Sequence, residues 1–189
     1  MPPYAVAFIL TLVVAVLSER TRLRAPFIMG SSALACIGYI ILLAQDSSRP
    51  GVSYLGTFFA AGGIYPAVAI VLAWPANNVS GQTKRAIANA MQISIGNLGA
   101  VIGTQLYRTE TSPRYFLGHG FSLGYLVANI AIVGVTWWVL NKENRAKEVE
   151  RQARGFQAWG ELGGDLADVV DSEQSQFLGD KDPRWIFQT

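Results

Sequence analysis

The sequence predicts an all-α polytopic membrane protein in which five transmembrane helices form a bundle, followed by a polar tail. Four stretches contain no charged residue. Each is about 20 residues or longer, which is the length that a helix needs to cross the roughly 30 Å hydrocarbon core. A shorter apolar run precedes them. The transmembrane bundle is therefore expected over residues 1–140, with spans at about 3–18, 25–44, 51–74, 86–107 and 115–140.

The first apolar run, 4–17, is the shortest, and alone it would cover only about 21 Å. Either the flanking residues Pro2, Pro3 and Ser18 extend it through the interface, or the chain lacks its beginning. The second run, 25–44, is long enough to span the core without such help.

The third span contains helix-weakening residues near its middle, namely Gly62, Gly63 and Pro66. In lipid such breaks are tolerated where neighbouring helices or water satisfy the backbone. One interpretation is a helix that bends beside a substrate path, with Tyr65 as a lining aromatic residue. The other is that Gly62 and Gly63 only permit close helix packing. The sequence favours neither.

The fourth span carries a glycine stripe and several amide side chains. Gly96, Gly99 and Gly103 recur every three or four residues, which favours a helix-packing surface over a ligand contact. Gln92 and Asn97 are the candidate substrate contacts, because amides can hydrogen-bond a carboxylate without carrying charge. Amides can equally tie one helix to another, and that interpretation is favoured.

The fifth span begins beside His119, the only histidine. This side chain could relay protons, although a histidine in the headgroup zone is the commoner case. Residues 141–154 mix basic and acidic side chains and predict a short juxtamembrane helix on the cytoplasmic side. Residues 155–189 are polar, acidic and interrupted by glycine, which predicts a mostly disordered cytoplasmic tail.

Basic residues predict the sides of the membrane, because they hold polar segments in the cytoplasm. Arginines are dense after the first span, Lys84 and Arg85 precede the fourth, and 141–154 contains five basic residues. These three segments are expected in the cytoplasm, together with the C-terminus.

Composition and motifs do not support a nucleic-acid-binding protein, a disulfide or cysteine zinc protein, or an enzyme. The basic residues collect beside the spans and the acids in the tail, which gives no support for nucleic-acid binding. Cys36 is the only cysteine, so an intramolecular disulfide or a cysteine zinc site is impossible. The sequence has no Walker loop, metal-ligand cluster or nucleophile with a paired base, and we expect neither an enzyme nor a cofactor.

The segments that connect the spans resemble a known family. The stretch 74–86, followed by 95–99 and 107–108, is similar to the last third of fungal permeases of the allantoate and nicotinate type, in the anion:cation symporter branch of the major facilitator superfamily. The stretches 113–115 and 178–183 also resemble the outer loop and the C-terminal tail of that family. The resemblance covers nearly the whole chain.

The family fold has twelve helices in two halves, and the resemblance implies that this chain supplies helices eight to twelve. A gating motif of the form Gly-x-x-x-Asp-Arg follows the eighth helix in the superfamily. Its counterpart here has alanine in place of glycine and Glu19 in place of aspartate, before Arg20. The resemblance implies that Glu19 and Arg20, with Arg24, Lys84 and Arg85, latch the cytoplasmic helix ends.

The resemblance also implies alternating access around a midplane site. Tyr65, Gly62 and Gly63 would lie nearest the substrate, and Gln92 and Asn97 would contribute. The implied partners are the plasma membrane lipid, a small organic anion such as a ureido acid or vitamin carboxylate, and protons. A protein of another class stays open: a non-transporting five-span membrane protein that serves as a regulatory or assembly partner, or a truncated gene remnant.

Overall fold

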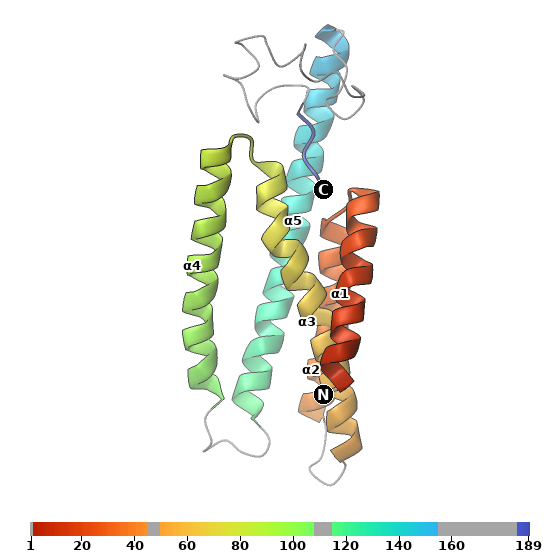
Figure 1. Ribbon diagram of the computed structural model, residues 1–189, viewed down its shortest axis with the longest axis vertical. Coiled ribbons are helices and arrows are strands. Elements are labelled where there is room, and N and C mark those ends of the chain that lie inside the picture. The colour runs from red at the N-terminus through yellow and green to blue at the C-terminus, as the bar shows by residue number, and fades with distance from the viewer. Residues whose placement is uncertain (1, 45–49, 108–114, 155–184) are drawn as a thin grey trace.

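Five long helices make up the regular structure in the part of the chain that the computed structural model describes, residues 2–44, 50–107, 115–154 and 185–189. All five are long and apolar enough to cross a membrane. They run alternately in opposite directions along one common axis (Figure 1). The predicted all-α fold with five spans is confirmed. The helices are α1 (Pro2–Thr21), α2 (Ala25–Ala44), α3 (Pro50–Asn78), α4 (Gln82–Leu106) and α5 (Phe116–Arg154).

Four helices, α1, α3, α4 and α5, are longer than the apolar runs that predicted them. The helix α1 has 20 residues because Pro2 and Pro3 extend the short run at its start and residues 18–21 extend it at its end, and prolines are tolerated in the first turn of a helix. The helix α3 continues for 29 residues through Pro66 and Pro75. The helix α5 continues for 39 residues, so 141–154 follows the fifth span without a break.

The predicted disordered tail lies mostly outside the described residues. Its last five residues, Trp185–Thr189, are described and run beside α5 at the end of the bundle where α1 ends (Figure 1). They contact several helices, as described below.

The core of the bundle lies where α2 meets α3 and α5. A cluster of buried side chains joins Ile28 of α2, Ile70 and Trp74 of α3, and Val133 of α5. Helix α1 packs on α3, whereas α4 has no buried residue. Large apolar side chains elsewhere point outward along the helices, as expected of surfaces that face lipid.

Candidate functional site

The middle of α3 is packed against two neighbouring helices. A Cβ atom added at Gly63 would lie 2.5 Å from the carbonyl oxygen of Ser31 on α2, and one at Gly62 would lie 3.0 Å from Cδ1 of Leu10 on α1. A side chain at Gly63 would therefore force α2 and α3 apart. Of the two interpretations of this pair, close packing accounts for Gly63. A role in a substrate path stays a prediction.

Pro66 leaves one backbone carbonyl in the middle of α3 without its usual helical donor. Proline has no N–H, so Pro66 cannot donate to the carbonyl of Gly62 one turn earlier.

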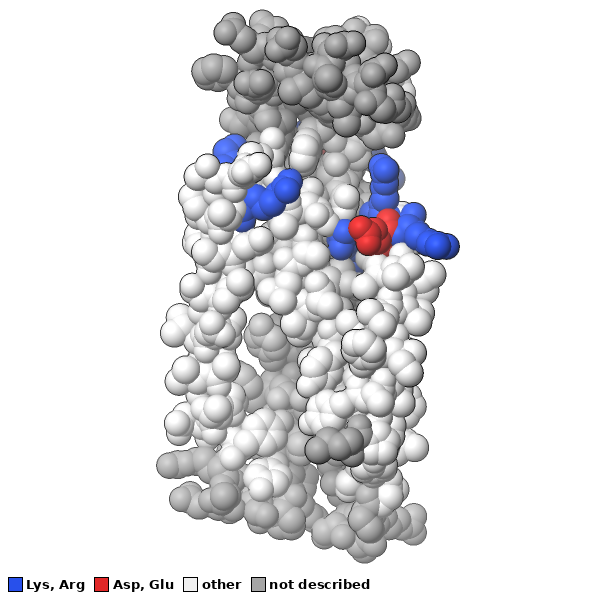
Figure 2. Space-filling model, in the orientation of Figure 1, with Lys and Arg blue, Asp and Glu red and all other residues white. Residues whose placement is uncertain are grey.

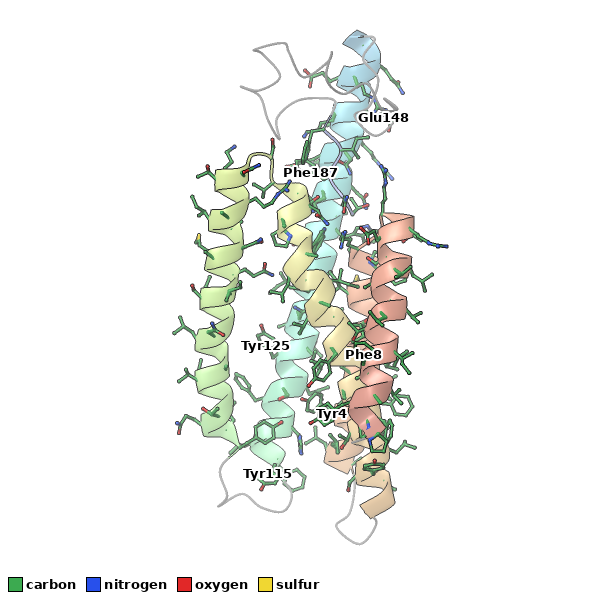
Figure 3. All side chains as sticks on the ribbon, in the orientation of Figure 1. Tyr4, Phe8, Tyr115, Tyr125, Glu148 and Phe187 are labelled. Atoms are coloured by element: carbon green, nitrogen blue, oxygen red, sulfur yellow. The ribbon has the colours of Figure 1, made fainter. Side chains whose placement is uncertain are left out.

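The nearby Tyr65 side chain is 49 % exposed and stacks edge to face on Tyr4 of α1, with ring centroids 6.2 Å apart. Tyr4 lies towards the N-terminal end of α1 (Figure 3). Tyr65 therefore belongs to the surface shared by α1 and α3.

Gln92 of α4 binds the backbone of α3. Its Nε2 donates to the carbonyl of Val71 at 2.9 Å. That carbonyl would normally accept from the residue four positions later, which is Pro75 and has no N–H. The amide of Gln92 therefore replaces a hydrogen bond that proline removes, as in the favoured interpretation of a tie between helices.

Two buried polar atoms of α4 have no hydrogen-bond partner within the described residues. They are Oδ1 of Asn89 and Oε1 of Gln92, and both are buried. Unpaired amide oxygens in a membrane protein are costly unless water or another polar group reaches them. Among the described residues, the buried side-chain oxygens that lack a partner both lie here, inside the fourth span.

The remaining predicted residues of α4 face away from the other helices. Asn97 is exposed, and a Cβ atom added at Gly96, Gly99 or Gly103 would meet nothing within 4 Å. Helix α4 stands at the edge of the bundle (Figure 1). The glycine stripe thus packs on no other described element, and its packing role stays a prediction for a partner beyond these residues. No described contact joins Tyr65 to Gln92 or Asn97.

The predicted latch residues gather at one end of the bundle, called here the basic end. Figure 2 shows Lys and Arg side chains collected there, with a small acidic patch beside them. Glu19, Arg20, Lys84 and Arg85 are exposed, and among the described residues neither Glu19 nor Arg20 has an ion-pair partner. The structure therefore brings these residues to one end without forming the expected charge pair.

Arg24 differs from the other latch residues because it binds neutral groups. Its Nε donates to Oε1 of Gln188 at 2.9 Å. With the amide of Asn77 turned so that its oxygen faces the guanidinium, Nη2 of Arg24 also donates to Asn77 at 2.6 Å. Asn78 and Asn144 bind the same terminal segment. Sequence analysis missed these asparagines, since no local pattern links them to residues so distant in the chain.

At the opposite end of the bundle, His119 lies in a cluster of tyrosines. Its Nδ1 is 3.3 Å from the hydroxyl of Tyr107, and that hydroxyl is 3.3 Å from Oγ of Ser122. The ring of Tyr39 on α2 lies 5.9 Å from the imidazole. A Cβ atom at Gly118 would come within 2.7 Å of the Tyr107 ring, so glycine makes room for this cluster. The proton-relay role of His119 stays a prediction.

Known transporters are similar to this chain along most of its length. An uncharacterized transporter of Schizosaccharomyces pombe is 37% identical over 82% of the chain and 30% of its own length. An MFS-type transporter of Penicillium expansum is 36% identical over 87% of the chain and 33% of its own length. The high-affinity nicotinic acid transporter of Saccharomyces cerevisiae is 31% identical over 78% of the chain and 27% of its own length.

No family model matches the sequence. No solved structure matches it either. The chain spans about a third of the length of the curated relatives that it matches. These relatives are named as transporters and not as enzymes. With five apolar helices of spanning length, the chain is an integral membrane protein that is similar, over most of its residues, to part of transporters of the major facilitator type.

Proposed function

We propose that this chain forms part of the second half of a secondary transporter, which carries a small organic anion together with protons by alternating access. The observation that carries this proposal is the similarity of about four-fifths of the chain to proteins named as transporters. One of them is named for nicotinic acid, which is a small carboxylate. That name supports an organic anion as the substrate class.

The unpaired face of α4 supports the presence of further helices around this chain. Asn97 and the glycine stripe are uncovered, and the buried oxygens of Asn89 and Gln92 lack partners among the described residues. A polar group that faces hydrocarbon without a partner costs several kcal/mol. A second bundle against α4 would cover this face and enclose a path lined by Gln92, Asn97 and Tyr65, beside the packed glycines of α3.

The proposed orientation places the basic end in the cytoplasm of a cell, with the plasma membrane as the site of the transporter. A cysteine in place of Gln82, at the basic end, should resist an impermeant thiol reagent added outside intact cells. A cysteine in place of Ser47, in the connection between α2 and α3, should react. Cys36 is first replaced by serine in both variants. The reverse pattern would contradict this orientation.

The transport proposal is tested by uptake of radiolabelled nicotinate and allantoate into vesicles. This chain alone should give no uptake above empty vesicles, because five helices form one incomplete bundle. Co-expression with helices one to seven of the Schizosaccharomyces pombe relative should give saturable uptake that depends on a proton gradient.

Two variants sharpen this experiment. Asn97→Leu should reduce the rescued uptake, whereas Gly120→Ala, at an uncrowded glycine of α5, should leave it unchanged. A chain that associates with the added helices but restores no uptake would contradict the transport proposal. That result would favour the non-transporting five-span protein as the alternative.

A further inference from the structure

Two asparagines from different helices hold the backbone of neighbouring residues in the segment Trp185–Thr189. Asn144 of α5 accepts from the N–H of Phe187 at 2.9 Å and donates to the carbonyl of the same residue at 2.9 Å. Asn78 of α3 accepts from the N–H of Gln188 at 2.7 Å and donates to its carbonyl at 3.1 Å. Each side-chain amide therefore satisfies both backbone groups of one residue.

This arrangement copies the pairing that an extended chain has in a β-sheet. In an antiparallel ladder, two opposed residues exchange both of their N–H···O bonds. Here the amides of Asn144 and Asn78 take the place of the neighbouring strands on the two sides. The dipeptide Phe187–Gln188 accordingly lies between α5 and α3, and Phe187 is seen beside α5 in Figure 3.

Further bonds to this segment also go mainly to its backbone. The indole Nε1 of Trp74 donates to the carbonyl of Gln188 at 2.8 Å, and the backbone N–H of Arg24 donates to the carbonyl of Thr189 at 2.5 Å. Trp74 is 8 % exposed and Thr189 is 9 % exposed, so these contacts are largely removed from water. The connection between α1 and α2, which contains Arg24, thus holds the segment too.

Lys147 closes the side of the segment that faces α5. Its ammonium lies 4.0 Å from the centroid of the Phe187 ring and donates to the carbonyl of Trp185 at 3.4 Å. A cation over an aromatic face is attracted to the electron-rich face of the ring. Apart from this ring and the amide of Gln188, the described bonds recognise peptide groups and no particular side chain.

The segment joins helices that otherwise have little contact with each other. Helices α3 and α5 both pack closely on α2, whereas their backbones seldom approach one another, although both contribute side chains to the core cluster. We propose that Asn78 and Asn144 form a slot for an extended peptide, that Trp185–Thr189 is its detachable occupant, and that the occupied slot clamps α3 to α5 and to the α1–α2 connection. This proposal does not depend on transport activity.

The clamp can open because its bonds are exchangeable with water. Each hydrogen bond between protein groups contributes little net free energy, since water satisfies the same groups when they separate. Release of Phe187 and Gln188 would let the ends of α3 and α5 move independently, whereas binding would hold them together. The basic end of the bundle would then have a closed and an open form.

Labelling of a cysteine within the segment tests the slot. In a full chain carrying Cys36→Ser and Thr189→Cys, the buried thiol should react slowly with a maleimide in lipid nanodiscs. Asn78→Ala or Asn144→Ala removes two hydrogen bonds and should raise the labelling rate about tenfold. Asn141→Ala, on α5 and outside the slot, is the matched control and should leave the rate unchanged. Equal rates in all four proteins would overturn the proposal.

A synthetic peptide of the sequence 185–189, with an acetylated N-terminus, tests whether the slot recognises backbone. In excess it should displace the chain's own segment and speed the labelling of the Thr189→Cys protein. The same peptide N-methylated at the positions of Phe187 and Gln188 lacks the two N–H donors and should have no effect. A peptide with alanine at the exposed Ile186 position should act like the parent. Equal activity of the N-methylated peptide, or no activity of the parent peptide at millimolar concentration, would contradict the slot.

Discussion

Helix α3 has a close neighbour on one side and a distant one on the other. It meets α2 through glycines, since a Cβ atom at Gly38 would lie 2.8 Å from the carbonyl oxygen of Gly56. It meets α4 through polar side chains such as Gln92, while the glycines of α4 meet nothing. The same residue type therefore serves as a packing device only where the fold supplies a partner.

The largest expected effect comes from filling the contact between α2 and α3. Gly63→Leu should lower the free energy of unfolding by about 3 kcal/mol, because the nearest atoms belong to the α2 backbone and cannot rotate away. Gly99→Leu is the matched variant in open space and should change the stability of this chain little. Thermal unfolding in detergent, followed by circular dichroism, measures both. Equal losses would mean that α4 is as closely packed as α2.

The second largest effect is expected at Gly81, the glycine that precedes α4 and sets its position. Gly81 has a φ of 88°, a backbone conformation that residues with a Cβ atom rarely adopt. Gly81→Ala should cost about 1 kcal/mol by strain alone, since its surroundings are open. Gly120→Ala, at an uncrowded helical glycine, should be neutral or slightly stabilising. The same thermal measurement separates the two variants. If Gly81→Ala were neutral, the backbone conformation at Gly81 would not determine the position of α4.

The smallest effect concerns the bond that ties α4 to α3. Gln92→Leu should cost about 0.6 kcal/mol, the average for a hydrogen bond between membrane helices. In a Pro75→Ala background the backbone of residue 75 can donate to Val71 again, so the same substitution should cost less. A double-mutant cycle measures this coupling, with Gln105→Leu, on the exposed side of α4, as control. If the effects of Gln92→Leu and Pro75→Ala on stability were additive, Gln92 would not be replacing the hydrogen bond that Pro75 removes.

The positions of the spans could be predicted from the sequence because bilayer thickness imposes a length on every charge-free run. The ends of the helices could not be predicted as well from the sequence. Thr21 and Asn78 are polar residues beyond the apolar runs that continue the helices. The Thr21 hydroxyl donates back to the carbonyl of Leu17, and the Asn78 amide binds the backbone of Gln188. Hydropathy contains no information about such extensions.

The roles of individual residues depend on neighbours that periodicity does not specify. The spacing of Gly96, Gly99 and Gly103 predicted a face, yet a face says nothing about what covers it. Asn78 pairs with Gln188, 110 residues away, through a side-chain amide and a peptide group. Any peptide group could accept that pairing, so no residue pattern marks it.

The length of α5 gives the bundle a rigid arm. Its 39 residues measure about 58 Å, whereas a bilayer with its headgroups is only about 40 to 45 Å thick. The last turns must therefore project into water as a continuation of the membrane-embedded rod, without a joint between them. A small tilt of α5 within the lipid becomes a larger sideways displacement at its tip. A tilt of α5 inside the membrane would thus displace any molecule that is bound to the far end of this helix.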